Sequence, residues 1–194
     1  PRDRRQRQMC IRDRYIIAAL MLNSALEINN FNTIYLKSLI DVLKKMGAKL
    51  KVSKNSIKVS KGSKLKSTSL STSPYPGFPT DLQAQLMSLM CISDGKSKIK
   101  ETIFENRFMH VPELNRLGAN ITVEKDTATI IGNQTFKGAQ VMASDLRASI
   151  SLVLAAMNAN GQTTLNRVYH LDRGYENIEK TLGSLGAKIK RQKN

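Results

Sequence analysis

The sequence blocks FPTDLQAQLMSLMC (residues 78–91) and ETIFENRFMHVPEL (residues 101–114) carry the pattern on which the rest of the chain is built. The first block predicts a helix that starts near Asp81. The second predicts the end of a strand, residues 98–104, followed by another helix. Single charged residues stand among apolar ones at the ends of these elements. Such an arrangement is typical of a site for a polar substrate.

The same order of elements occurs three times. In each copy the second helix ends at a Gly-Ala pair, at Gly47, Gly118 and Gly186, which lie 71 and 68 positions apart. A glycine at this place ends a helix in the left-handed conformation, and an alternating strand follows it. In the first two copies a turn then leads to a further strand. Each unit therefore reads βαβαββ, with units at about 15–74, 75–138 and 139–194, and the third is expected to stop at a strand over 187–190.

Composition describes a globular chain with a basic surface. The 194 residues include 31 Lys and Arg against 15 Asp and Glu, a formal net charge of +16. Beyond residue 14 the lysines stand singly rather than in one stripe, which favours a solvated surface over a nucleic-acid footprint. The sequence also lacks an aromatic RNA-binding strand motif and a recognition-helix signature. We therefore expect no nucleic-acid partner, although a basic nucleic-acid-binding module stays open as an alternative.

Neither a membrane span nor a metal site is predicted. The longest apolar run, from Tyr15 to Leu22, is far shorter than the roughly 18 residues that a spanning helix requires. Cys10 and Cys91 have no spacing for zinc or for a disulfide framework, which fits a reducing compartment. We expect a cytoplasmic protein without a membrane, metal or cofactor partner.

Residues 1–14, PRDRRQRQMCIRDR, form an Arg-rich leader. They have no apolar periodicity, so the sequence predicts disorder and no burial. The segment is similar to translated adapter sequence, and we predict that it is not native to the protein. A signal peptide is the alternative, but its apolar part, residues 16–22, also fits the first repeat unit.

Two aspartates and two arginines in the later units have alternative explanations. Asp81 and Asp145 each follow a hydroxyl residue at a predicted helix start, where helix capping alone would explain a carboxylate. On residue chemistry alone capping is favoured over catalysis. Arg147 lies near Asp145, and Arg173 follows Asp172, so surface ion pairs would explain both arginines.

Four blocks resemble, in order, the C-terminal part of the UDP-N-acetylglucosamine 1-carboxyvinyltransferase family of enolpyruvyl transferases: FPTDLQAQ (78–85), ETIFENRFMHVPEL (101–114), GAQVMASDLRAS (138–149) and YHLDRGYE (169–176). The likeness covers residues 15–194, weakens before residue 74 and is absent from the leader. It implies an α/β (α+β) fold, an inside-out barrel domain of βαβαββ repeats with helices within and sheets outside, here incomplete. Substrates would bind in a cleft between this domain and another.

The resemblance also implies a reaction. The family transfers the enolpyruvyl group of phosphoenolpyruvate to the 3-hydroxyl of UDP-N-acetylglucosamine and releases phosphate through a tetrahedral ketal, the first committed step of peptidoglycan precursor synthesis. The implied partners are these two substrates and a missing N-terminal domain of the same chain. The fragment alone is therefore expected to be inactive. The related transferase that acts on shikimate 3-phosphate has the same repeat plan and remains an alternative.

Three matched positions would serve proton transfer and the sugar nucleotide. Asp81 matches the aspartate that meets the sugar 3-hydroxyl and is the candidate general base. Asp145 matches an active-site acid that orients an arginine or shares in proton transfer. Ile103 matches a position whose backbone contacts the sugar nucleotide.

Four further matched positions would bind anions or line the cleft. Arg147 and Arg173 match arginines that face phosphoenolpyruvate, and Arg173 is also a catalytic candidate; a guanidinium fork suits both phosphate and carboxylate. Glu105 and Arg107 lie near the same cleft in the family. The family's reactive cysteine belongs to the other domain, so Cys91 is expected to be a core residue, and His110 is expected to be structural.

Overall fold

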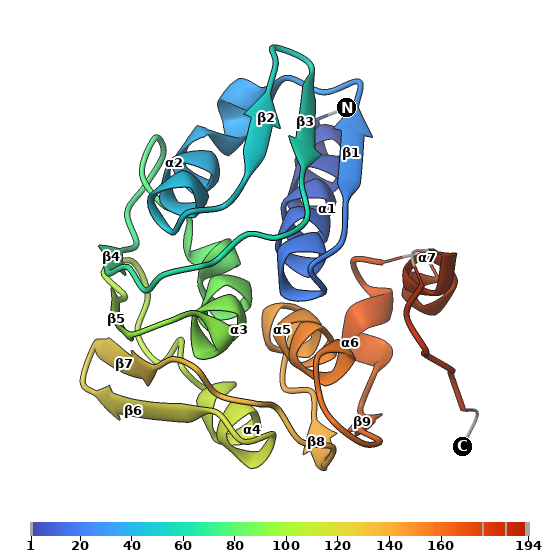
Figure 1. Ribbon diagram of the computed structural model, residues 1–194. Helices are drawn as coiled ribbons and strands as arrows, with labels where there is room; N and C mark the ends of the chain where they lie inside the picture. The colour runs from blue at the N-terminus through green and yellow to red at the C-terminus, as the bar shows by residue number, and fades with distance from the viewer. Residues whose placement is uncertain (1, 176, 185, 193–194) are drawn as a thin grey trace.

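Three groups of elements follow one another along the chain, and the computed structural model describes residues 2–175, 177–184 and 186–192 (Figure 1). The first group is α1 (Arg2–Met21), β1 (Leu26–Asn29), η1 (Thr33–Leu36), α2 (Lys37–Lys45), β2 (Leu50–Val52) and β3 (Ser56–Val59). The second is β4 (Leu70–Ser71), η2 (Thr80–Leu82), α3 (Gln83–Ile92), β5 (Lys96–Lys100), α4 (Val111–Arg116), β6 (Asn120–Glu124) and β7 (Thr127–Ile131). The third is β8 (Gln140–Met142), α5 (Leu146–Met157), β9 (Thr164–Asn166), α6 (Tyr169–Asp172) and α7 (Ile178–Ser184).

Each group builds its own sheet. The strand orders are β1-β3-β2, β4-β5-β7-β6 and β8-β9. The hairpins β2-β3 and β6-β7 are antiparallel, whereas β4 pairs with β5 and β8 with β9 in parallel across an intervening helix. The order β4-α3-β5-α4-β6-β7 is the βαβαββ order expected from the sequence. Strand β4 pairs with β5 and so belongs to the second sheet, although it precedes the expected start of the second unit at about residue 75.

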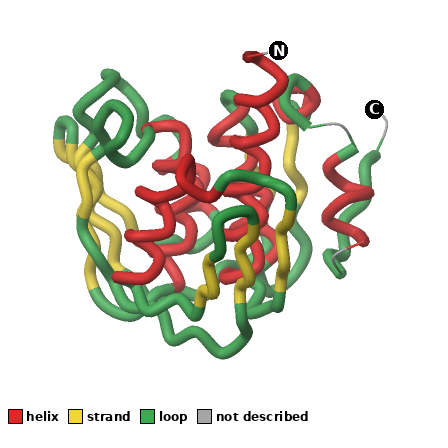
Figure 2. The backbone as a smooth tube through the Cα atoms, turned by 90° about the horizontal axis from the view of Figure 1, so that it is seen from above, coloured by secondary structure: helices red, strands yellow, loops and turns green. Residues whose placement is uncertain are grey.

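Helices fill the centre and the strands lie toward the rim, while α7, near the C-terminus, lies outside this arrangement (Figure 2). Every residue of α3 from Gln83 to Cys91 is buried, and α3 contacts both α1 and α5. A helix that is buried on all sides belongs to the core of a domain. Ser88 of α3 donates a hydrogen bond to the carbonyl oxygen of Ser151 on α5 (3.1 Å), and such small side chains let the two helices approach. The helices-inside arrangement predicted for the domain is confirmed.

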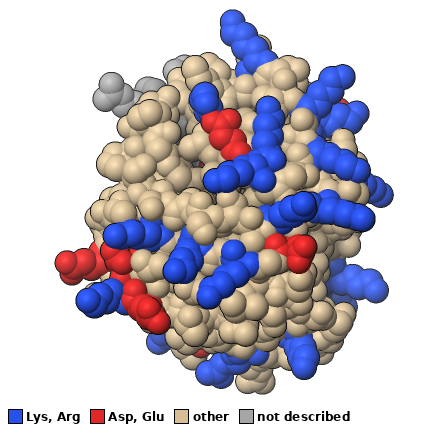
Figure 3. Space-filling model, turned by 60° about the vertical axis from the view of Figure 1, so that its left-hand side comes forward, with Lys and Arg blue, Asp and Glu red and all other residues tan. Residues whose placement is uncertain are grey.

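The sheets face solvent with lysine side chains. Along β5, the side chains of Lys96, Lys98 and Lys100 are exposed while Ser97 and Ile99 are buried, the alternation of a half-buried strand. Figure 3 shows Lys and Arg side chains spread over one face of the molecule, with few acidic ones between them. Among the described residues, none of the helices combines the length and the apolar character needed to traverse a bilayer.

The structure differs from the prediction over the leader. Residues 2–14 are helical and continue into the apolar run of α1, rather than being disordered. Arg and Gln are good helix formers, so a helix anchored by buried residues 16–21 can extend through them. Asp13 and Arg14 are buried, which contradicts the expectation that the leader buries nothing. Burial raises the pKa of Asp13 to about 7, although the nearby Arg14 charge acts to lower it. That the leader is not native stays a prediction.

Two further strand predictions are wrong. Strand β5 ends at Lys100, four residues before the predicted end, and the site below gives the reason. Residues 187–192 hold no strand, whereas in the first two units the strand after the glycine pairs with a following strand. In the third unit no partner strand follows within the described part of the chain. The short helix α6 was also not predicted.

Candidate active site

Asp81 joins the second unit to the third. It lies within η2, whose N-cap position is taken by Pro79, and it makes no capping bond. Its carboxylate instead accepts a hydrogen bond from Nε of Arg147, on the first turn of α5. The two side chains are 41% and 35% exposed, so the ion pair is open to solvent. Asp81 is an acidic residue of the first turn, as expected, but it makes no capping bond. The surface pair of Arg147 with Asp145 is replaced by a pair across the unit boundary.

Asp145 is the N-cap of α5. Its backbone is extended (φ −156°, ψ 176°), and Oδ1 accepts hydrogen bonds from the backbone N–H groups of Arg147 (2.7 Å) and Ala148 (3.1 Å). These bonds satisfy two donors that a helix start leaves unpaired. The capping interpretation is therefore confirmed for Asp145, which fixes the helix turn that carries Arg147.

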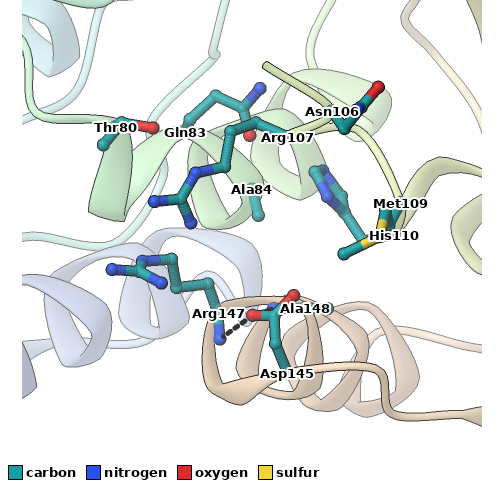
Figure 4. Close-up of a pocket in the computed structure, with 10 residues that line it drawn as sticks. All are labelled: Thr80, Gln83, Ala84, Asn106, Arg107, Met109, His110, Asp145, Arg147 and Ala148. Carbon is teal, nitrogen blue, oxygen red and sulfur yellow. Dashed lines mark hydrogen bonds between the residues drawn. The ribbon is translucent and has the colours of Figure 1, made fainter. Parts of the chain in front are cut away.

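A small surface hollow of about 40 Å³, here called the inner hollow, lies between the start of α3, the turn before α4 and the start of α5. Its walls come from the second and third units: Thr80, Gln83, Ala84, Asn106, Arg107, Met109, His110, Asp145, Arg147 and Ala148. In Figure 4 the side chains of Arg107 and Arg147 extend from opposite walls toward the same side of the hollow. Two guanidinium groups that converge in this way suit an anionic ligand.

A wider, open groove of about 660 Å³, the outer groove, adjoins the inner hollow and shares Asn106 and Arg107 with it. It is lined by residues 100–108, 125 and 126, and so contains Ile103 and Glu105. The Arg107 guanidinium carbon lies 4.4 Å from the centroid of the Phe104 ring, a cation–π contact. This contact orders Arg107 at the junction of the two cavities.

Glu101 is a buried carboxylate that sequence reasoning missed, with 4% of its surface exposed. Its oxygens accept hydrogen bonds from the hydroxyls of Thr72 and Thr80 (2.8 Å each) and from the backbone N–H groups of Ile103 (3.0 Å) and Phe104 (3.3 Å). The last two bonds turn the chain away from the ladder after Lys100, which is why β5 is shorter than predicted. An acidic residue at the end of an alternating run was the only signal in the sequence.

Gln83 and His110 are two other residues that sequence reasoning missed as site residues. Both are at most 3% exposed, both line the inner hollow, and Nε2 of each has no hydrogen-bond partner among the described residues. Burial lowers the pKa of His110 to about 4, although the Asp145 charge acts in the opposite sense. Unpaired buried polar groups cost free energy, so their place in this wall favours contact with a polar ligand.

Arg173 stands apart from the other candidates. It is the exposed C-cap residue of α6 and lines neither cavity. The next residue, Gly174, packs on Leu146 so closely that a Cβ at Gly174 would lie 2.8 Å from a Leu146 methyl carbon, which places the end of α6 against the start of α5. Asp172 pairs with Arg191 (2.6 Å), and this hydrogen bond lowers the pKa of Asp172. The proposed surface pair between Asp172 and Arg173 is therefore wrong.

Cys91 is fully buried on α3, and burial raises the pKa of its thiol to about 12, so it is a core residue as expected. The structure does not describe the side chain of Cys10. In the part of the chain that the structure describes, no group of three or more His, Cys, Asp or Glu is placed to hold a metal ion.

Known proteins of similar sequence and structure share this plan. The family described as EPSP synthase (3-phosphoshikimate 1-carboxyvinyltransferase) matches residues 13–182. UDP-N-acetylglucosamine 1-carboxyvinyltransferase of Pelagibacter ubique is 53% identical over 177 residues, which are 91% of this chain and 42% of that protein. The enzyme of the same name from Azorhizobium caulinodans is 50% identical over 197 residues, 98% of this chain and 46% of that protein. The chain thus spans less than half the length of these relatives.

Solved structures agree. The enolpyruvyl transferase NikO from Streptomyces tendae superimposes with a TM-score of 0.86 at 29% identity, over 93% of this chain and 43% of that one. EPSP synthase from Acinetobacter baumannii has a TM-score of 0.68 at 16% identity, over 91% and 42% of the two chains, which shows the shared fold alone. The fold class predicted from the repeats and the four sequence blocks is confirmed. The chain belongs to the EPSP synthase family of carboxyvinyltransferases and is a homologue of UDP-N-acetylglucosamine 1-carboxyvinyltransferase.

Proposed function

We propose that this chain is part of a UDP-N-acetylglucosamine 1-carboxyvinyltransferase, which transfers the enolpyruvyl group of phosphoenolpyruvate to the sugar 3-hydroxyl at the start of peptidoglycan precursor synthesis. The observation that carries the proposal is the Asp81–Arg147 pair, formed between two repeat units beside the inner hollow. The choice of substrate is supported by about 50% identity to relatives of that name. A cytoplasmic location belongs to the same proposal.

Asp81 is the proposed general base. Its Oδ1 is held by Arg147, and its Oδ2 accepts no hydrogen bond from the described residues. Oδ2 can therefore accept the proton of the sugar 3-hydroxyl while that oxygen forms a bond to C2 of phosphoenolpyruvate. The C2=C3 double bond breaks in the same step, and C3 takes up a proton from a general acid, which gives the tetrahedral ketal. The ketal then expels phosphate and loses a proton from C3, which restores the enol ether.

The arginines are proposed to hold the anionic groups. Nε of Arg147 is engaged by Asp81, which leaves its two Nη groups for a phosphate or carboxylate. Arg107 reaches the same hollow, and Arg173 follows α6 next to the start of α5. Asp145 is proposed to act mainly by fixing the helix turn of Arg147, because its Oδ1 already accepts two backbone hydrogen bonds.

The outer groove is proposed to take the sugar nucleotide. It contains the backbone of Ile103, which the family resemblance assigns to that contact, together with Glu105 and the exposed ring of Phe104. Because the chain spans less than half the length of its relatives, a further domain is proposed to close both cavities. The chain alone is then expected to be inactive, since the reaction requires two substrates held in register.

A hybrid enzyme tests the proposal. Residues 15–194 replace the matching segment of the Pelagibacter ubique enzyme, and phosphate release from phosphoenolpyruvate is measured with UDP-N-acetylglucosamine and with shikimate 3-phosphate. We expect turnover with UDP-N-acetylglucosamine only, with the unaltered parent enzyme and the isolated chain as positive and negative controls. Turnover with shikimate 3-phosphate alone, or with neither acceptor, would overturn the assignment.

The basic-module alternative has its own test. It requires salt-sensitive binding of DNA or RNA that survives removal of residues 1–14. We expect that removal to abolish most of such binding, since beyond residue 14 the lysines stand singly along the sequence rather than in one stripe.

A further inference from the structure

Glu101 is a buried charge for which the proposed reaction has no use. No Lys or Arg side chain in the described part of the chain pairs with it, and its four hydrogen-bond donors are two hydroxyls and two backbone N–H groups. Oε1 accepts three of these bonds and Oε2 accepts the fourth. Only an acceptor-only group, the carboxylate, satisfies all four donors at once.

The four bonds join three separate segments. Thr72 follows β4, Thr80 opens η2, and Ile103 with Phe104 begins the wall of the outer groove. The hydroxyl of Thr72 also accepts a hydrogen bond from the N–H of Thr102 (2.9 Å), so the same cluster ties the groove wall to β4 twice. Hydrogen bonds to an ionised acceptor are about twice as strong as neutral ones, which makes Glu101 the main link of the cluster.

Two of these segments carry the groups that the proposed function assigns to one substrate. Thr80 directly precedes Asp81, the proposed base for the sugar 3-hydroxyl, and Ile103 offers the backbone contact to the sugar nucleotide. One buried carboxylate thus sets the position of both groups relative to each other. Such buried second contacts are what hold a binding site within a fraction of an ångström of its working geometry.

We propose that Glu101 is a positioning residue for the sugar-nucleotide acceptor: it sets the backbone at Ile103 and, through Thr80, the carboxylate of Asp81. This inference rests on the proposed function. It concerns the acceptor first, because Glu101 bonds the backbone at Ile103 directly and reaches Arg147 of the inner hollow only through Thr80 and Asp81.

The first experiment uses the chain itself and needs no catalysis. Amide hydrogen exchange at Ile103 and Phe104 is measured by NMR in the wild type, in Glu101→Ala and in Glu101→Gln. We expect exchange at these two amides to rise about 10- to 100-fold in Glu101→Ala and less in Glu101→Gln, which keeps one acceptor oxygen. Unchanged amides in α3 show that the fold is retained. Glu124→Gln, an exposed carboxylate on β6, is the matched control.

The second experiment uses the hybrid enzyme. We expect Glu101→Ala to raise the KM for UDP-N-acetylglucosamine about tenfold and to lower kcat, while the KM for phosphoenolpyruvate stays within about twofold, with partial rescue in Glu101→Gln. Equal changes in both KM values, or no change in either, would overturn the inference. If the wild-type hybrid lacks activity with both acceptors, the proposed function fails and the acceptor role fails with it, while the exchange data still decide whether Glu101 orders the groove wall.

Discussion

The starts of two helices, in the second and third repeat units, have nearly the same sequence, but their aspartates make different interactions. Residues 80–84 read TDLQA and residues 144–148 read SDLRA. In the third unit Asp145 caps α5 through two backbone hydrogen bonds. In the second unit Asp81 makes no capping bond and pairs with Arg147 instead. A repeated motif can therefore hold one structural carboxylate and one that is available for chemistry.

The backbone just before each motif explains the difference. Asp145 itself is extended and precedes the first helical residue, as an N-cap does. In the second unit Pro79 takes the extended position (φ −74°, ψ 138°), and a 3-10 turn begins at Thr80. The hydroxyl of Thr80 bonds to Glu101, and Asp81 lies one residue inside the turn, where its carboxylate meets Arg147 rather than backbone N–H groups.

The largest expected effect is a difference in kcat between variants of the two aspartates. In the hybrid enzyme, Asp81→Asn is expected to lower kcat by about 10²- to 10⁴-fold, because an amide cannot accept the hydroxyl proton. Asp145→Asn is expected to lose far less, since asparagine caps a helix as well as aspartate does. Steady-state phosphate release measures both, with Asp41→Asn, an exposed residue of α2, as the control. Equal losses at positions 81 and 145 would mean that both aspartates transfer protons.

A second prediction uses pH, because His110 lies close enough to Asp145 for that charge to act on it. The pKa of His110 is about 4 in the folded chain and its ordinary value is 6.5, so the unfolded chain binds the proton first as the pH falls. The free energy of unfolding therefore does not depend on His110 above pH 6.5. Between pH 6.5 and pH 4 protonation of His110 in the unfolded chain lowers it by about 3 kcal/mol. Urea unfolding at pH 7 and pH 4 is expected to show this loss in the wild type and not in His110→Leu.

The loss of stability at low pH must be compared between His110→Leu and the wild type, because Asp13 changes the stability of both proteins in the opposite direction. Its pKa is raised to about 7 by burial, so its contribution grows as the pH falls. NMR titration adds a sharper test: Asp145→Asn should lower the pKa of His110 further, whereas Asp81→Asn should leave it unchanged. A change in the pKa of His110 in the Asp81 variant would show that Asp81, rather than Asp145, is the charge that acts on the imidazole ring.

The third prediction concerns the shared partner of both aspartates. Arg147→Lys is expected to lower kcat/KM in the hybrid enzyme about tenfold, because an ammonium cannot bond Asp81 and an anion with one planar fork. Arg116→Lys, an exposed position on α4 near Glu113, is the matched control. Full activity of Arg147→Lys would show that the fork geometry is not needed.

The smallest expected effect is on stability. Asp145→Ala removes a cap and should lower the free energy of unfolding of the chain by about 1 kcal/mol. Asp81→Ala breaks only a half-exposed ion pair and should change it by no more than about 0.5 kcal/mol. Urea unfolding near pH 7 measures both. A larger cost at position 81 than at position 145 would reverse the roles given to the two residues.

Most of the candidate site could be predicted from the four sequence blocks, because residues at matched positions of related sequences lie at matching places in the shared fold. The structure places Arg107, Asp145 and Arg147 in the inner hollow, Ile103 and Glu105 in the outer groove, and Asp81 on Arg147. Arg173 is near α5 but lines neither cavity. The residues that were missed share one property, which is that they are polar or charged side chains buried in the fold: Gln83, Glu101 and His110.

The sequence alone determined the repeat and the order of its helices and strands in the first two units, because glycine caps and hydrophobic periodicity act over a few residues, and the resemblance of four sequence blocks indicated the family. It could not decide which aspartate caps a helix, where β5 ends or whether the leader is helical. The choice between the aspartates depends on contacts across 21 and 66 positions, those of Thr80 with Glu101 and of Asp81 with Arg147. The end of β5 depends on the bonds of Ile103 and Phe104 to Glu101, whose carboxylate also accepts hydrogen bonds from the distant Thr72 and Thr80. A side chain that has several local partners takes the one that the packed units bring within reach, and only the tertiary structure supplies that choice.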